Sequence, residues 1–208
     1  MITPAVLPYG DAGLLLEVAD TAEVVVLADA CRAADLPGVL DVVPAARTVL
    51  LVLEPGTELA SVRRAVEELE VRAGEGAAAP AGSIEIPVVY DGPDLAEVAR
   101  LTGLSEADVV AAHTGRPWRV AFGGFAPGFA YLSGGDPRLA VARRDEARTA
   151  VPAGSVGLAG EFSGIYPRPS PGGWQLIGRT DSVLWDSDRD PPALLAPGAE
   201  VRFTVAGT

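Results

Sequence analysis

The stretch Gly123-Gly-Phe-Ala-Pro-Gly-Phe-Ala-Tyr-Leu132 decides how the second half of this chain folds. Its glycines and its proline disfavour a helix and favour tight turns, because glycine tolerates positive φ and proline restricts φ. The same character returns in Ser170-Pro-Gly-Gly-Trp-Gln-Leu-Ile-Gly-Arg-Thr180. Short strands joined by tight turns are therefore predicted for this part of the chain.

The window from His113 to Thr180 also differs from the rest of the chain in charge. It holds eight arginines and four acidic residues, in a protein whose formal net charge is −12. It carries eight of the twelve aromatic residues as well. Arginines beside aromatic ring faces suit a concave site for a planar, anionic small molecule.

The overall composition limits the class of protein. With 208 residues, 49% hydrophobic and 21% charged, the chain can form one large domain or two small ones with packed cores. It lacks an apolar run of the roughly 20 residues that a membrane span needs, and it begins without a basic signal region. The single cysteine, Cys31, excludes an internal disulfide and fits the cytoplasm. The acidic balance disfavours nucleic acid and membrane surfaces as partners.

The chain contains no lysine, and all 16 of its basic residues are arginines. Schiff-base chemistry and the lysine of a phosphate-binding P-loop are therefore excluded. One histidine and one cysteine also exclude a His/Cys metal centre, and we expect no metal site. Any chemistry must use carboxylates, hydroxyls, backbone amides, arginines or His113.

Hydrophobic patterns predict a small α+β sandwich at the N-terminus, in the order β-α-β-β-α. The expected elements are a strand at 12–18, a helix at 21–34 capped by Thr21, strands at 39–43 and 48–53, and a helix at 56–72. A low-complexity linker at 73–82 then separates two domains, 1–78 and 79–208.

The second domain is predicted to be a closed or nearly closed β-barrel, because short strands are broken throughout by Gly and Pro. A strand at 83–90 comes first, followed by helices at 94–101 and 105–112, the latter capped by Ser105. Further strands are expected at 118–122, 129–132, 151–158, 164–166, 174–177, 182–185 and 201–205.

Two groups of side chains are candidates for chemistry. His113 has the one side chain whose ordinary pKa lies near neutrality, and it is either a site acid–base or a histidine that caps a helix. Arg143, Arg144 and Arg148 are close enough in sequence to converge on a carboxylate or phosphate. Alternatively, they form a solvated run paired with the two acids between them.

Four motifs in this order resemble the KipI / 5-oxoprolinase B-subunit family, also called allophanate hydrolase subunit 1. They are Gly123–Leu132, Val151-Pro-Ala-Gly-Ser-Val-Gly-Leu-Ala-Gly160, Gly164-Ile-Tyr-Pro167 and Ser170–Thr180. The resemblance covers nearly the whole chain. It implies an N-terminal α+β domain followed by a cyclophilin-like β-barrel.

This resemblance implies one component of an ATP-dependent 5-oxoprolinase, which opens 5-oxo-L-proline, a small anionic amide, to L-glutamate. The partners would be a homologous cyclophilin-like C subunit and a separate A subunit, and the chain would be inactive alone. ATP with Mg would belong to the assembled complex, and no covalently bound cofactor is implied. Phosphorylation of the lactam oxygen would make the amide carbon electrophilic.

The family also implies alternatives. One is a KipI-like regulator that inhibits a sensor histidine kinase, and the other is a component of an allophanate or urea carboxylase type of amide hydrolase. The kinase that a KipI-like protein inhibits controls sporulation. The abundance of Ala, Arg and Gly without Lys indicates a high-GC genome, where this sporulation pathway is not expected. This favours the enzyme.

Site residues follow from the same resemblance. The catalytic candidates are His113, Arg143 and Arg148, with the arginines holding the substrate carboxylate and the transferred phosphate. The substrate-binding candidates are Phe125, Pro127, Gly128, Phe129, Tyr131, Ser155, Tyr166, Gln175 and Arg179.

The chain departs from the family pattern in two places. Alanine precedes Arg143 and Arg148 where the family usually has proline, and Glu161-Phe162 replaces a common Gln-Thr pair. A carboxylate at position 161 would compete for the arginines.

Overall fold

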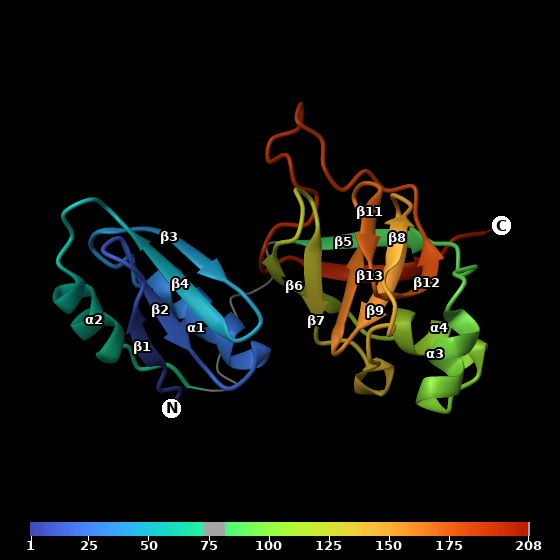
Figure 1. Ribbon diagram of the computed structural model, residues 1–208, viewed down its shortest axis with the longest axis horizontal. Coiled ribbons are helices and arrows are strands. Elements are labelled where there is room, and N and C mark those ends of the chain that lie inside the picture. The colour runs from blue at the N-terminus through green and yellow to red at the C-terminus, as the bar shows by residue number, and fades with distance from the viewer. Residues whose placement is uncertain (73–81, 208) are drawn as a thin grey trace. The chain divides into compact units, whose positions relative to one another are not determined.

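The computed structural model describes residues 1–72 and 82–207. The chain falls into two compact units, Met1–Pro80 and Ala81–Thr208, which are described separately below (Figure 1). Nearly all of the segment 73–82 that we interpret as a linker lies outside the described residues.

The N-terminal unit is built on an antiparallel sheet with the strand order β1-β2-β4-β3 (Figure 1). The strands are β1 (Ala5–Pro8), β2 (Gly13–Glu17), β3 (Val39–Pro44) and β4 (Thr48–Leu53). The predicted β3–β4 hairpin is confirmed. The sequence analysis missed β1, because this short, largely exposed edge strand ends in proline and lacks an alternating pattern.

Two helices, α1 (Thr21–Ala33) and α2 (Leu59–Glu67), cover one face of this sheet. Alternate residues of β4, beginning at Val49, point into the core, as expected for a strand with one buried face. Val24 and Cys31 of α1 and Val62 of α2 share that core. The predicted α+β sandwich is therefore confirmed.

The ends of both helices differ from the prediction. Asp20, not Thr21, caps α1, because its carboxylate accepts a hydrogen bond from the Glu23 N–H at 3.0 Å. Thr21 instead donates its hydroxyl to the Ala46 carbonyl. Helix α2 ends five residues before the predicted position, and beyond it buried Val71 accepts a backbone hydrogen bond from Ile2.

The C-terminal unit is a seven-stranded sheet in the order β12-β9-β10-β7-β6-β13-β5. Its strands are β5 (Ser83–Val88), β6 (Trp118–Gly123), β7 (Ala130–Ser133), β9 (Ser155–Ala159), β10 (Phe162–Ile165), β12 (Gln175–Arg179) and β13 (Glu200–Val205). Neighbouring strands are antiparallel except for β13 and β5. Val89, just after β5, and Arg179 of β12 exchange two backbone hydrogen bonds of 2.9 Å. This contact brings the sheet edges together and confirms the nearly closed barrel.

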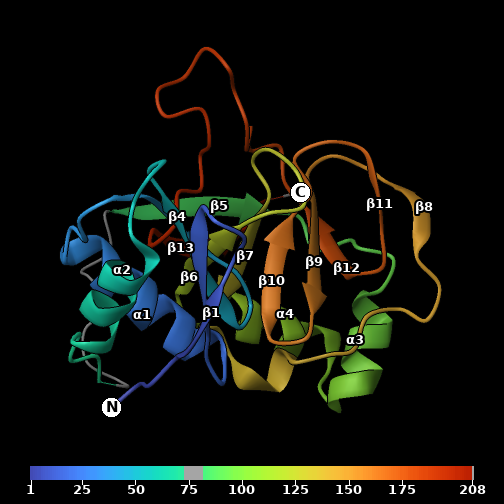
Figure 2. The ribbon, with the colours of Figure 1, turned by 60° about the vertical axis from the view of Figure 1, so that its left-hand side comes forward.

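Helices α3 (Leu95–Thr102) and α4 (Glu106–Thr114) lie at one end of the barrel strands, the lower end in Figure 2, with the short 3-10 helix η1 (Pro137–Leu139). Val98 and Val109 of the two α-helices are fully buried in the barrel core. Ser105 caps α4 as predicted and accepts a hydrogen bond from the Asp108 N–H. Among the helices described, none has the length and apolar character to cross a membrane.

Two strand predictions in the barrel are wrong. The stretch 151–158 is divided between β8 (Arg148–Val151) and β9, because Gly154 turns the chain with φ +78°. Strand β8 pairs with β11 (Ser170–Gly172) in a separate two-stranded sheet. Residues 182–185 form no strand and pair with the chain only through the isolated bridge of Trp185 with Ala193, while the Arg189 guanidinium donates to the carbonyls of Val183 and Leu184.

Candidate functional site

Buried Asp94 organises the arginines of the second unit. It precedes α3, and its Oδ1 atom accepts hydrogen bonds from Arg144 Nη1 at 2.9 Å and Arg148 Nη2 at 2.7 Å. Its Oδ2 atom accepts the Leu176 N–H at 2.7 Å. One carboxylate therefore ties the segment 142–148, which we call the arginine loop, to α3 and to strand β12.

The close approach of the Asp94 segment to the barrel depends on Gly92. The Gly92 N–H donates to the Ile177 carbonyl, and the Asp94 N–H donates to the Leu176 carbonyl. A Cβ atom on Gly92 would lie only 2.3 Å from the backbone of Ile177, so no larger residue fits without movement.

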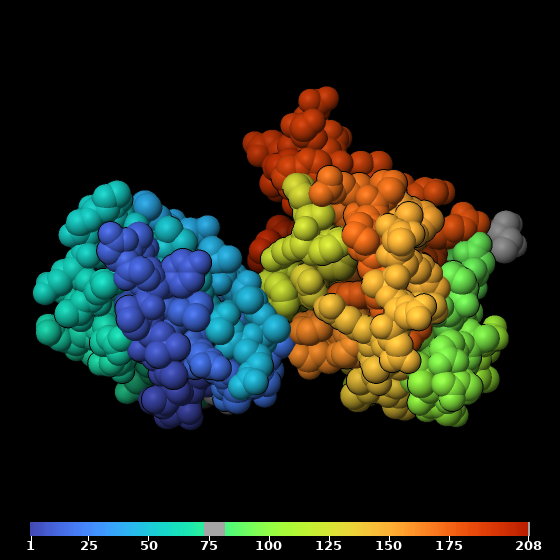
Figure 3. All heavy atoms as spheres, viewed as in Figure 1, coloured from blue at the N-terminus to red at the C-terminus, as the bar shows by residue number. Residues whose placement is uncertain are grey.

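Arg143 differs from its two neighbours in the arginine loop. Arg144 and Arg148 are committed to Asp94, whereas exposed Arg143 has no hydrogen bond or ion pair with any residue that the structure describes. Figure 3 shows this part of the chain, in gold, on the surface of the C-terminal unit next to the green α3 and α4 region. The guanidinium of Arg143 is therefore available to bind a ligand.

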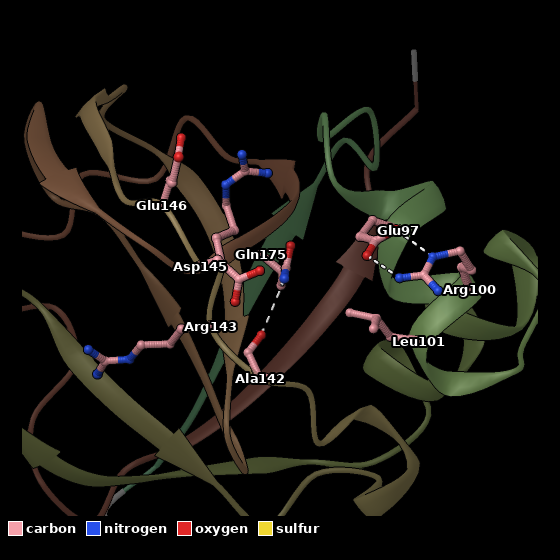
Figure 4. Close-up of a pocket in the computed structure, with 9 residues that line it drawn as sticks. Glu97, Arg100, Leu101, Ala142, Arg143, Asp145, Glu146 and Gln175 are labelled. Carbon is pink, nitrogen blue, oxygen red and sulfur yellow. Dashed lines mark hydrogen bonds and ion pairs between the residues drawn. The ribbon is translucent and has the colours of Figure 1, made fainter.

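Arg143 stands beside a cavity of about 500 Å³, which we call the polar cavity (Figure 4). It is lined by Glu97, Arg100, Leu101, Ala142, Arg143, Arg144, Asp145, Glu146 and Gln175. Glu97 and Arg100 pair with each other through hydrogen bonds of 2.6 and 2.8 Å. The Arg100 hydrogen bond lowers the pKa of Glu97 below its usual value, so this pair is charged at neutral pH.

Gln175 forms the buried floor of the polar cavity. Its Nε2 donates to the Ala142 carbonyl at 3.3 Å, which joins β12 to the start of the arginine loop. Its Oε1 atom is buried and has no hydrogen-bond partner among the described residues. The Nε atom of Arg144 is in the same situation.

Arg143 also lines a smaller cavity of about 80 Å³, which we call the aromatic slot. The other lining residues are Phe125, Phe129, Tyr131, Tyr166, Gly172, Gly173 and Trp174. The rings pack edge to face, for example Phe129 on Trp174 with centroids 5.4 Å apart. Burial raises the pKa of Tyr166, which keeps its hydroxyl protonated at neutral pH.

Phe125 lies at the mouth of the aromatic slot. It is 58% exposed and has φ +64°, a conformation that residues other than glycine rarely adopt. Its ring touches the edges of Phe129 and Tyr166. Such strain is maintained only when the surrounding structure holds it, and it is typical of binding sites.

His113 lies in the barrel core and lines neither cavity. Its ring is fully buried, stacks on Phe203 with centroids 4.2 Å apart, and hydrogen-bonds Tyr90 and Ser163, each at 2.8 Å. Burial lowers the pKa of His113 to about 3, so the ring is neutral near pH 7. The structure does not bring His113 together with Arg143 or Arg148.

The remaining expected residues are placed as follows. Ser155 is buried in β9, and exposed Arg179 pairs with Asp91 at 2.9 Å beside a separate cavity of about 260 Å³. Pro127 and Gly128 belong to the loop that carries Phe125, and a Cβ on Gly128 would lie 2.8 Å from Trp185. The expected residues that gather at the two cavities are Phe125, Phe129, Tyr131, Arg143, Tyr166 and Gln175.

Sequence analysis missed Asp94 as a site residue, because it lies about 50 residues before the arginines that it binds. The sequence analysis treated it only as the first residue of the predicted helix 94–101. Across residues 1–72 and 82–207, no group of three or more His, Cys, Asp or Glu side chains is arranged to hold a metal ion.

The nearly closed barrel defines the class of the C-terminal unit, a cyclophilin-like barrel, which here carries the arginine loop beside the polar cavity and the aromatic slot. The chain belongs to the family of the carboxyltransferase domain, subdomains C and D, whose model matches residues 4–195. The family relationship expected from the four motifs is thereby confirmed.

Three similar proteins illustrate the relationship. The chain is 46% identical over 177 residues to the B subunit of 5-oxoprolinase from Escherichia coli O157:H7, covering 83% of this chain and 80% of that protein. The solved structure of TTHA0988 matches 95% of this chain with a TM-score of 0.77 and 37% identity. The Kluyveromyces lactis urea carboxylase matches 99% with a TM-score of 0.71 and 18% identity, which shows the fold alone. This chain covers 40% of the first structure and 22% of the second.

Proposed function

We propose that this chain is the B subunit of an ATP-dependent 5-oxoprolinase, which opens 5-oxo-L-proline to L-glutamate together with a C subunit and an A subunit. The observation that carries the proposal is the 46% identity to the B subunit of the Escherichia coli enzyme over most of both chains. Arg143 supports it as well, because this residue lines both cavities, its guanidinium is unpaired among the described residues, and the substrate is a small anion.

The chemistry that we propose for the complex has three steps. The lactam oxygen attacks the terminal phosphorus of ATP, which forms a phosphorylated lactam and releases ADP. Water then adds to the activated carbon, the ring C–N bond breaks and the nitrogen takes a proton, which leaves an acyl phosphate on the opened chain. A second water hydrolyses this acyl phosphate to the carboxylate of L-glutamate and inorganic phosphate. Anionic groups develop on the substrate in these steps, and positioned arginines stabilise such groups.

Within this scheme Arg143 binds an anionic group of the substrate directly. Arg144 and Arg148 act indirectly. Asp94 binds both guanidinium groups, and these contacts fix the position of the loop that presents Arg143. We assign no proton transfer to His113, because its ring is buried and neutral.

We place the ATP and Mg²⁺ sites at the level of the assembled complex and expect little activity from the chain alone. The longer related chain TTHA0988, of which this chain covers 40%, supports a partnership with further polypeptide. We also propose a cytoplasmic location, because ATP is the co-substrate.

The test is reconstitution with the A and C subunits from the same genome, followed by measurement of ATP hydrolysis that depends on 5-oxoproline. Arg143→Ala should lower kcat/KM by about 10- to 100-fold, the effect of losing one charge-assisted hydrogen bond. Arg138→Ala is the matched control, because Arg138 pairs with Asp136 outside both cavities and should leave turnover unchanged.

Two results would contradict the proposal. One is a complete complex that hydrolyses ATP at the same rate with and without 5-oxoproline. The other is inhibition of a sensor histidine kinase by the isolated chain, which would favour the regulatory alternative.

A further inference from the structure

The barrel closes where the end of β5 meets the end of β12, and it opens again beyond that contact. Val89 and Arg179 form an antiparallel bridge with two backbone hydrogen bonds of 2.9 Å. Two residues further on, this register would place Asp181 opposite Pro87, but Pro87 has no N–H to donate, and these two residues form no backbone hydrogen bond. A cavity of about 260 Å³ lies there instead. We call the gap between β5 and the segment 181–185 the open seam.

The segment 181–185 resembles a strand that is paired on one edge. Exposed residues alternate along it with less exposed ones, and it contains no turn or bend. On one edge, the Leu184 carbonyl accepts the Leu194 N–H at 2.9 Å, and the Asp186 N–H donates to the Pro192 carbonyl at 3.0 Å. Successive residues of an extended chain direct their backbone groups to opposite edges, so residues of odd number face the other way, as Arg179 does toward β5.

The edges that face the open seam carry unpaired backbone groups. Among the described residues, the N–H groups of Asp181, Val183 and Trp185 have no hydrogen-bond acceptor. On β5, the Val88 carbonyl accepts the Ala206 N–H, which places residues of even number against β13 and those of odd number toward the seam. An unpaired strand edge is a template on which a further strand can pair.

The outer side of the open seam is acidic. Glu85 of β5 and Asp181 are exposed, and neither has an ion-pair partner among the described residues. The two arginines of the adjoining chain are engaged, since Arg179 pairs with Asp91 and Arg189 donates to backbone carbonyls of its own loop. Side chains of directly opposed residues in paired strands lie about 5 Å apart, so basic residues are favoured on the outer side of an added strand.

Apolar side chains are also present along the open seam. Val183 is 60% exposed and Trp185 is 43% exposed, and both belong to the outer side. On the inner side, Ile86 of β5 and Leu184 are buried in the barrel core. The inward side chains of an added strand would therefore lie beside an apolar surface, which favours β-branched residues.

We infer that the open seam is a docking site for an extended segment of a partner protein, in which basic residues alternate with β-branched apolar residues. The segment pairs its backbone with Asp181, Val183 and Trp185, and it directs its basic side chains toward Glu85 and Asp181. A second copy of this chain is a poor occupant, because two chains with a formal net charge of −12 repel each other. This inference goes beyond the proposed function and does not rest on it.

The experiment titrates the 15N-labelled full chain with the peptide acetyl-Arg-Val-Arg-Val-Arg-Val-amide and follows the backbone amides by NMR. One control peptide has glutamate in place of each arginine, and the other carries an N-methyl group on each arginine nitrogen. We expect the arginine peptide to shift the amide signals of Asp181, Val183 and Trp185. Each control should bind at least about tenfold more weakly, because the first reverses the charge and the second removes the N–H groups that pair with this edge.

Two variants at position 183 separate the backbone from the side chain. Val183→Pro removes the central N–H of the edge and should weaken binding of the arginine peptide by about 3- to 10-fold, whereas Val183→Ala keeps this N–H and should lose less. Glu85→Gln and Asp181→Asn should each weaken binding by about 2- to 5-fold at low ionic strength, and this difference should shrink as salt is added.

The inference would be overturned by equal binding of the arginine peptide and either control, by the absence of saturable binding, or by shifts confined to acidic surface outside the open seam. Dimerisation of the chain that shifts the same three signals without peptide would assign the seam to a second copy and would also overturn it. If Val183→Pro does not fold, the three peptides on the unmodified chain still decide.

Discussion

The environment of His113 removes it from acid–base chemistry at neutral pH. Its two ring nitrogens are occupied by hydroxyl groups, and aromatic rings surround it, so that ionisation would bury a charge without a carboxylate partner. This explains the pKa of about 3. The alternative of a helix-capping histidine also does not describe it, because the ring points into the core.

The lowered pKa of His113 predicts a pH dependence of stability. An unfolded histidine takes up a proton below about pH 6.5, while the folded one does so only near pH 3. The unfolded state therefore binds more protons between these values, and the free energy of unfolding falls as the pH decreases through this window. The slope from this one group is at most about 1.4 kcal/mol per pH unit.

Urea denaturation at a series of pH values between 7 and 5 tests this prediction. A His113→Gln variant has no titratable group at this position, so its stability should change less with pH than that of the unmodified protein. Parallel pH profiles for the two proteins would show that His113 does not contribute.

At the scale of elements, three segments meet at Asp94: the start of α3, the arginine loop and strand β12. The meeting requires Gly92, since a Cβ there would touch backbone atoms of β12, and Gly178 likewise allows Val89 to approach β12. The arginine loop contains little regular structure of its own. Its position is therefore determined by the Asp94 contacts and by the Arg144 N–H bond to the Gly173 carbonyl.

Asp94→Asn should destabilise the C-terminal unit by about 2–3 kcal/mol, because it removes a buried charge that accepts three hydrogen bonds. It should also lower turnover in the reconstituted complex mainly by raising KM, since the loop that presents Arg143 is released. Thermal unfolding and steady-state kinetics measure the two effects.

Glu200→Gln serves as the matched control for this prediction. Glu200 pairs with Arg202 in β13, and that guanidinium is largely exposed, so the loss of its charge should matter much less. Equal destabilisation by the two substitutions would contradict a special role for Asp94.

At the scale of the molecule, the core of the barrel is built from residues of the C-terminal unit alone. The two hydrophobic clusters of the C-terminal unit draw all of their residues from positions beyond 83, and the closing contact joins Val89 to Arg179. The N-terminal cluster likewise draws only on positions up to 71. Each unit therefore has its own core.

We predict that a fragment of residues 81–208 folds alone. It should show a β-rich circular dichroism spectrum and a single cooperative thermal transition, because its buried residues contact one another. A fragment with dispersed NMR signals would agree with this expectation. A fragment that lacks cooperative unfolding would show that the barrel depends on the first unit.

The sequence by itself determined the fold class, most strands, the capping of α4 and the family. Alternating β-branched residues and turn-forming Gly and Pro act locally, so they can be interpreted without coordinates. The strand prediction for 182–185 was wrong, because this stretch pairs with the chain only through the isolated bridge of Trp185 with Ala193.

Only the tertiary structure decided which arginine is available. Arg143, Arg144 and Arg148 are equivalent in the sequence, and a distant carboxylate, Asp94, separates them into one free and two bound groups. Barrel closure brings Asp94 against β12, and burial by residues far along the chain neutralises His113. Contacts of this kind depend on how the strands pair around the barrel, and local sequence patterns carry no information about that pairing.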